Sequence, residues 1–111
     1  MARSAALSEL QNRAVEVAGL LKTLSHPLRL LIVCELSEGE RSVSALEIAT
    51  GAAQPTLSRD LARLRREGVV KARRESKSVY YRLNDAKAAR MIEALCAAFG
   101  PEPKKKKRRR S

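Results

Sequence analysis

Apolar side chains recur at helical spacing in the first forty residues and predict two successive helices. In residues 5 to 24, seven apolar side chains fall three or four positions apart and form one broad face of a single helix. The next stretch, HPLRLLIVCELSEG, is apolar on nearly all sides, which predicts a helix at the centre of the core. Ser25 is its expected N-cap, Pro27 lies in its first turn, and Gly39 ends it.

A further amphipathic helix is predicted near the other end of the chain. Asn84 or Asp85 caps it, and it runs to about Phe99, with an apolar stripe formed by Met91, Ile92, Leu95 and Phe99. A small domain cannot cover the apolar faces of both terminal helices. The N- and C-terminal helices are therefore predicted to pack against their copies in a homodimer with a twofold axis.

The middle of the chain reads as two short helices joined by a tight turn. Ser44 and Glu47 have the spacing of a capping box at the start of the first helix. Gly51 is suited to the left-handed residue at its end, Pro55 starts the second helix, and Gly68 closes that helix. Two helices joined by a short Gly-containing turn are typical of a helix-turn-helix.

A hairpin follows these helices directly. From Val69 to Leu83, apolar and polar residues roughly alternate on both sides of a tip at Glu75 to Ser78. Because the tip has no Asn-Gly or Asp-Gly pair, its turn is expected to be a longer loop. Arg41 to Val43 are expected to pair with the hairpin as a short edge strand. The predicted fold class is mainly α with a small β-hairpin, a winged helix-turn-helix.

Positive charge is concentrated in the second helix and the hairpin. Residues 59 to 82 hold nine basic and three acidic side chains, a net charge of +6, whereas residues 1 to 100 reach +5. The run Lys104 to Arg110 raises the total to +11. A field of one sign favours the phosphates of double-stranded DNA. We expect a winged helix-turn-helix dimerising domain over residues 1 to 100 and a disordered polybasic tail over residues 101 to 111.

Nine side chains are predicted to contact DNA. Leu57, Leu61 and Leu64 mark the buried face of the second helix, which leaves its N-terminal end and other faces for the major groove. The twofold axis then predicts a pseudo-palindromic operator with half-sites roughly 34 Å apart. The predicted contacts are Gln54, Thr56, Ser58, Arg59, Arg63 and Arg66 on the helix and Arg73, Arg74 and Lys77 on the wing.

Several other classes of protein are disfavoured. The chain has no run of 18 apolar residues, and its N-terminus lacks the apolar core of a secretion signal, so a cytoplasmic protein without a membrane partner is expected. Its single histidine, His26, is interpreted as a residue of a capping turn. One histidine cannot support a nucleophile, base and orienting acid, and no phosphate-binding Gly-rich loop occurs, so neither an enzyme nor a cofactor is expected.

Three phrases, LSHPLRLLIVCELSEGERSV, LSRDLARLRREGVV and SVYYRL, resemble the ArsR family of bacterial winged-helix repressors. The resemblance covers about residues 10 to 99. It implies a homodimeric repressor that leaves its operator when an inducer binds. Many relatives have a histidine where this chain has Asp60. The acid is expected to accept a hydrogen bond from a cytosine amine or from a neighbouring arginine.

The two cysteines extend this resemblance. Cys34 and Cys96 resemble the thiol pair of the persulfide-responsive branch that includes BigR and SqrR, in which sulfane sulfur links the two helices through a polysulfide bridge. The resemblance implies reactive sulfur species as the inducer. Inserted sulfur atoms can join thiols too far apart for a direct disulfide. Each cysteine taken singly fits inert packing in an apolar helix better, whereas the joint match favours a pair of sensor thiols.

Two alternatives stay open beside the thiol-switched repressor. Metal-sensing relatives commonly carry closely spaced cysteines around the position of Cys34 or Asp and His ligands on the last helix, and this chain has too few such ligands, so no metal site is predicted. A metal sensor would need Glu or Asp from a partner chain beside Cys34 or Cys96. The other alternative is a constitutive DNA-coating protein that depends on the polybasic tail.

Overall fold

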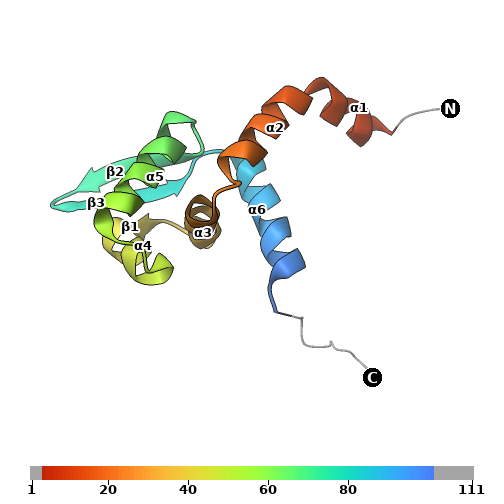
Figure 1. Ribbon diagram of the computed structural model, residues 1–111. Helices are drawn as coiled ribbons and strands as arrows, with labels where there is room; N and C mark the ends of the chain where they lie inside the picture. The colour runs from red at the N-terminus through yellow and green to blue at the C-terminus, as the bar shows by residue number, and fades with distance from the viewer. Residues whose placement is uncertain (1–3, 102–111) are drawn as a thin grey trace.

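The computed structural model describes residues 4–101 and has the predicted winged helix-turn-helix architecture (Figure 1). Helices α4 and α5 form the helix-turn-helix, and strands β2 and β3 form the wing. The helices are α1 (Ala5–Asn12), α2 (Ala14–Thr23), α3 (Pro27–Leu36), α4 (Val43–Thr50), α5 (Gln54–Arg66) and α6 (Ala86–Phe99), and the strands are β1 (Arg41–Ser42), β2 (Val70–Glu75) and β3 (Ser78–Leu83).

The core lies where α3 and α5 meet the sheet and α6. Because Leu57, Leu61 and Leu64 recur at helical spacing, α5 buries all three on one face, as predicted. Other fully buried side chains of the core come from α3, α4, β2 and α6, among them Ile32, Val33, Leu46, Val70 and Ile92. The opposite face of α5 is thereby left to solvent.

The N-terminal helix predicted for residues 5 to 24 is in fact two helices. Arg13 leaves the helical conformation, with φ −113° and ψ 17°, and separates α1 from α2. Its guanidinium donates two hydrogen bonds to Glu16, at 2.8 and 2.6 Å, in the first turn of α2. The periodicity of three and four continues through a one-residue break, so the pattern alone could not locate it.

The ends of α3 also differ from those predicted. His26, and not Ser25, is the N-cap residue, because the Ser25 hydroxyl donates to the Lys22 carbonyl at 2.7 Å and so belongs to the end of α2. Pro27 does occupy the first turn. The helix ends at Leu36, three residues before the predicted end at Gly39.

The capping box predicted at the start of α4 is wrong. Ser42 is the N-cap, and its Oγ accepts a hydrogen bond from the Ala45 N–H at 3.0 Å. Ser44 therefore lies in the first turn, where its side chain is exposed. The predicted C-cap is confirmed: Gly51 has φ 72°, a conformation that costs other residues roughly 1–2 kcal/mol.

The predicted boundaries around α5 are confirmed in part. Pro55 lies in the first turn and Gly68 follows the helix with φ 78°, while the helix already begins at Gln54. Asp85 is the N-cap of α6 and accepts a hydrogen bond from the Lys87 N–H at 2.8 Å, as one of the two predicted alternatives.

The wing is a tight antiparallel hairpin. Val70 pairs with Leu83 at its base and Glu75 pairs with Ser78 at its tip. The longer loop predicted there is wrong: two residues form the turn, and Ser76 takes the positive φ, 56°, that the missing Asn-Gly pair would have supplied.

The predicted edge strand is present as β1, and β3 is the central strand of the order β1-β3-β2. Ser42 pairs with Tyr80 and Arg41 pairs with Tyr81. Tyr81 packs against the core, whereas the ring of Tyr80 lies under the Arg73 guanidinium, 4.7 Å from its centroid.

The terminal helices keep much of their apolar surface exposed. No residue of α1, which lies wholly in the described part of the chain, is buried. On α6, Ile92 is buried, but Phe99 of the same predicted stripe is 85% exposed. Figure 1 shows the wing and α1 on opposite sides of the core.

No helix within residues 4–101 is by itself long and apolar enough to cross a membrane. Taken together, α2 and α3 reach the required length and hydropathy, but they are bent by 102°. From Glu102 onward the predicted polybasic tail lies outside the described residues.

Candidate nucleic-acid interface and thiol pair

The N-terminal end of α5 presents polar side chains away from the core. Gln54 and Ser58 are exposed, and the Ser58 hydroxyl donates to Gln54 Oε1 at 3.2 Å. Thr56 lies beside them and is half-buried. Their place at the start of the second helix is where a helix-turn-helix meets base edges.

A polar hollow of about 350 Å³ joins this end of α5 to the wing. It brings three of the predicted DNA contacts, Gln54, Ser58 and Lys77, to one surface. It also includes Ser44 and Ser78, which sequence reasoning did not select. Ser44 was missed because it was assigned to a cap. Its hydroxyl and those around it can donate to phosphate oxygens.

The arginines of the interface differ in their availability. Among the described residues, Arg59, Arg66 and Arg74 are exposed and form no ion pair. Arg63 is half-buried, and its Nε donates to Glu67 Oε2 at 2.7 Å. The first three are free to contact phosphates, while Arg63 is already partnered.

Arg73 is held by two carboxylates. It donates to both oxygens of Glu40, at 2.9 and 2.8 Å, and to Glu75 at 2.6 Å. These hydrogen bonds raise the pKa of Arg73 and lower the pKa of Glu40. Arg73 thus ties the wing to the segment that precedes β1, and its charge is largely neutralised before any DNA arrives.

Asp60 does not face DNA, which contradicts its expected contact with a cytosine amine. Its side chain is buried inside the protein, 3.3 Å from Arg29 Nη1 and 3.7 Å from His26 Nδ1. The arginine partner is therefore Arg29 of α3. The sequence held the signal, because Asp60 lies three residues after Leu57 and four before Leu64, on the face that these leucines bury.

The two predicted sensor thiols meet between α3 and α6. Cys34 is half-buried on α3, Cys96 is exposed on α6, and both are free. Burial raises the pKa of the Cys34 thiol to about 11, and interaction with the neighbouring Cys96 thiol contributes to the rise. Residues 62 positions apart in the sequence thus form one thiol pair.

The structure also bears on the alternative of a metal sensor, which would need several ligating side chains close together. Within residues 4–101, no three His, Cys, Asp or Glu side chains lie close enough together to hold a metal ion.

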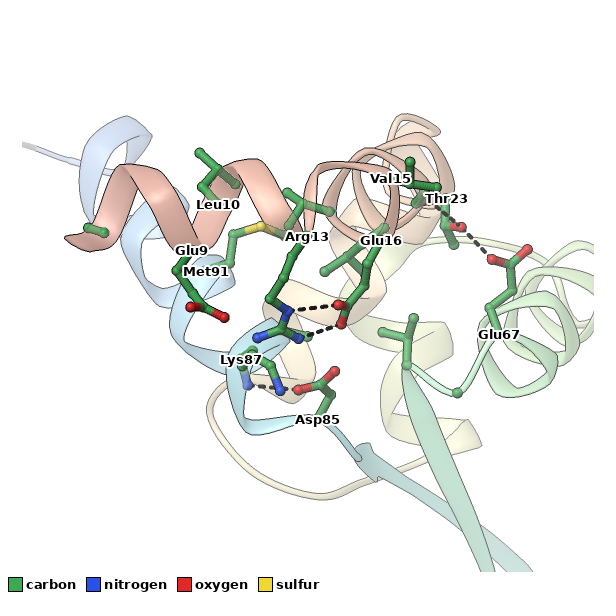
Figure 2. Close-up of a pocket in the computed structure, with 17 residues that line it drawn as sticks. Glu9, Leu10, Arg13, Val15, Glu16, Thr23, Glu67, Asp85, Lys87 and Met91 are labelled. Atoms are coloured by element: carbon green, nitrogen blue, oxygen red, sulfur yellow. Dashed lines mark hydrogen bonds and ion pairs between the residues drawn. The ribbon is translucent and has the colours of Figure 1, made fainter. Parts of the chain in front are cut away.

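A second hollow, of about 640 Å³, lies on the side of the core away from the wing (Figure 2). Residues of α1, α2 and α6 line it, together with the turn that follows α5. Figure 2 shows Leu10, Val15 and Met91 around it, with the Arg13–Glu16 pair among them. Val15 is 90% exposed and Leu10 is 49% exposed. This apolar surface belongs to the terminal helices that were predicted to form a dimer.

Residues 26–72 match the model of the bacterial regulatory protein arsR family. The biofilm growth-associated repressor of Xylella fastidiosa (strain Temecula1) is 52% identical over 96 residues, which cover 86% of this chain and 84% of that protein.

Solved structures of other proteins have a similar fold. The transcriptional repressor BigR from Xylella fastidiosa superposes with a TM-score of 0.80 at 52% identity, over 86% of this chain and 97% of that one. A homodimeric winged helix-turn-helix DNA-binding domain from Mycobacterium bovis superposes with a TM-score of 0.65 at 34% identity, over 88% and 89%. These relatives are regulators, which confirms the prediction that the chain is not an enzyme. The match at 52% identity over most of both chains shows that this protein belongs to the arsR family of bacterial regulatory proteins.

Proposed function

We propose that this protein is a homodimeric transcriptional repressor that releases a pseudo-palindromic DNA operator when reactive sulfur species bridge Cys34 and Cys96. The observation that carries the proposal is the thiol pair itself: two free cysteines from α3 and α6 adjoin in a chain that is 52% identical to a repressor. Repression follows from that relative, and the inducer is what the resemblance of the thiol pair to the persulfide-responsive branch implies.

The DNA-binding part of the proposal is supported by the surface around α5. Gln54 and Ser58 offer hydrogen-bonding groups for base edges. Arg59, Arg66 and Arg74 offer unpaired positive charge for phosphates. The polar hollow connects these groups to Lys77 at the wing tip. Such a surface could place α5 in a major groove while the arginines and the wing contact the flanking phosphates.

The homodimer is supported by the apolar surface around the second hollow. Val15 and Leu10 are exposed there, and a similar domain from Mycobacterium bovis is homodimeric. A copy of the chain related by a twofold axis would cover this surface with the same surface of its own. Two α5 helices would then face one side of a DNA duplex.

Sulfur transfer to the pair begins at Cys96, because it is the exposed thiol. The Cys96 thiolate attacks the outer sulfur of glutathione persulfide and forms a protein persulfide, and glutathione thiolate leaves. A second persulfide converts Cys34 in the same way. The terminal sulfur of the Cys96 persulfide anion then attacks the inner sulfur of the Cys34 persulfide. Hydrosulfide leaves, and a trisulfide joins the two helices with every sulfur accounted for.

A covalent bridge between Cys34 and Cys96 would restrict the position of α6 relative to the DNA-binding core. Cys34 lies on α3, whose Ile32 and Val33 are fully buried in the core beside α5. Cys96 lies on α6, one of the predicted dimer helices. A bond between them fixes α6 against the DNA-binding core, and so alters the spacing of the two α5 helices across the twofold axis.

The proposed switch can be tested by measuring affinity for a DNA duplex that the reduced protein selects from a random pool. At fixed salt, glutathione persulfide should weaken binding to this duplex by roughly 5- to 150-fold, the usual range of allosteric coupling. Intact mass should show one added sulfur atom and two lost hydrogens. Cys34→Ser and Cys96→Ser should each keep the reduced affinity after treatment. Unchanged wild-type affinity alongside the bridged mass would refute the switch, and enrichment of no duplex would refute the repressor itself.

A further inference from the structure

A buried polar network joins α5 to the joint between α2 and α3. Asp60, on α5, is only 2% exposed. Arg29, in the first half of α3, places Nη1 3.3 Å from Asp60 Oδ1 and donates from Nε to the Thr23 carbonyl at 2.7 Å. One guanidinium therefore bridges the end of α2 and the middle of α5.

The same joint holds α5 at a second point. Thr23, also 2% exposed, has its hydroxyl 2.7 Å from Glu67 Oε1 and 3.1 Å from the Gly19 carbonyl, and its single proton serves one of these acceptors at a time. Glu67 is the C-cap residue of α5 and also accepts from Arg63. Figure 2 shows the Thr23–Glu67 bond at the edge of the apolar hollow.

The two attachment points are seven residues apart, which is two helical turns, so they lie on one face of α5. A helix held at one point can pivot about it. A helix held at two points along its axis has its direction and its rotation defined. Both attachment points involve Thr23, through its hydroxyl and its carbonyl. Thr23 is the last residue of α2, which belongs to the N-terminal segment predicted to form the dimer.

Burial of Asp60 is unfavourable unless its charge is compensated. In this structure His26 Nδ1 and Asp60 Oδ2 are buried and have no hydrogen-bond partner among the described residues, although they lie only 3.7 Å apart. The carboxylate thus depends mainly on Arg29. An apolar residue would pack this face without that dependence, so the acid is explained better by orientation than by stability.

We propose that Thr23, Arg29, Asp60 and Glu67 are positioning residues for sequence-specific DNA binding, which set the angle of α5 relative to the α2–α3 joint. This inference rests on the proposed DNA-binding function of α5. It is separate from direct contact with DNA, since Thr23 and Asp60 are buried.

The proposal is tested by whether replacing Asp60 strengthens or weakens DNA binding. Removal of a carboxylate lowers the negative charge of the protein and should by electrostatics strengthen binding to any DNA. Asp60→Asn should instead weaken binding to the selected duplex by about tenfold, as one mismatched base pair does, because α5 is misaligned. Binding to a random-sequence duplex of equal length should be unchanged or stronger. Glu38→Gln, which removes a carboxylate that is 76% exposed, is the matched control and should not weaken binding to either duplex.

A second pair of variants keeps the test decisive if Asp60→Asn does not fold. Thr23→Val removes the hydroxyl with little change in shape, and Thr23→Ser retains it. Thr23→Val should weaken binding to the selected duplex alone, and Thr23→Ser should restore it. Equal losses on both duplexes, or a gain on the selected duplex with Asp60→Asn, would overturn the proposal.

Amide hydrogen exchange on the DNA-free protein separates this inference from the proposed function. Exchange that becomes faster in α5 with Thr23→Val, and not with Thr23→Ser, supports the attachment even if the wild-type protein enriches no duplex. Exchange in α5 that matches the wild-type protein in both variants would overturn it.

Discussion

Among the individual side chains, Cys34 and Cys96 have different tasks in the proposed switch. Burial keeps Cys34 protonated near neutral pH, since its pKa is raised to about 11. Cys96 is exposed on the last helix. A thiol reacts through its thiolate. In the proposed switch Cys96 is therefore the first to take up sulfur, and Cys34 takes up sulfur afterwards from a second persulfide.

This difference predicts the order and the pH dependence of alkylation. Iodoacetamide should modify Cys96 well before Cys34 near neutral pH, and the rate at Cys34 should rise as the pH approaches 11. Peptide mass spectrometry of a time course measures both rates. Equal rates at neutral pH would contradict the assignment.

The raised pKa of Cys34 also has a consequence for folding stability, because in an unfolded chain the Cys34 thiol loses its proton from about pH 9.0. The stabilisation from the buried neutral thiol is complete below that pH and is lost as the pH rises through about 11. Cys34→Ser should lack this loss.

Side-chain placement was predictable where an apolar pattern defined it. Leu57, Leu61 and Leu64 were assigned to the core by spacing alone, and they are buried. Asp60 follows the same spacing, but the prediction left it between a cytosine amine and a neighbouring arginine, because a charged residue is usually exposed. Its partner Arg29 lies 31 residues away, and no local pattern reveals a pairing at that range.

The helices and strands themselves were largely predictable, and so were the caps at Gly51 and Asp85, but several other ends were not. Ser42 and Ser44 are equally suited to cap a helix. Ser42 is the cap because β1 pairs it with Tyr80 and holds it in an extended conformation, with φ −74° and ψ 162°. The wing turn was misjudged for a related reason: Ser76 adopts a positive φ that the pairing of β2 and β3 imposes.

The wing gives a prediction about the salt dependence of DNA binding. Arg74 forms no ion pair among the described residues, whereas Arg73 is already partnered by Glu40 and Glu75. Arg74→Ala should reduce the slope of log affinity against log salt by about 0.9, the value for one phosphate contact. Arg73→Ala should change the slope less, since little of its charge is available. Titrations at several salt concentrations measure both slopes, and a larger change for Arg73→Ala would show that its ion pairs exchange for phosphates.

At the scale of the whole molecule, the described part of the chain is more extended than a self-contained domain of its size. Its radius of gyration is 16.7 Å, against about 13 Å for a compact domain of 100 residues. The excess comes with a helix, α1, that buries none of its residues. Such a protomer fits one half of a larger assembly.

Assembly can be tested with two matched substitutions. Val15 is 90% exposed and lines the apolar hollow, while Ile48 is 85% exposed on α4, outside it. Val15→Glu should convert the proposed homodimer to a monomer, because it would bury a charge in the proposed interface, and Ile48→Glu should leave that homodimer intact. Analytical ultracentrifugation distinguishes the two states. A wild-type monomer, or dissociation by Ile48→Glu alone, would contradict a dimer through this surface.

The division of α5 into an outer and an inner face has a consequence for how such proteins diversify. Gln54, Ser58 and Arg59 are exposed and take no part in the core, while Asp60 and the leucines lie inside. Under the proposed DNA-binding role of α5, a duplicated gene can therefore change its outer residues, and with them its set of target promoters, without rebuilding the protein that carries them. New regulatory circuits become accessible through a few surface substitutions, while the interior is inherited unchanged.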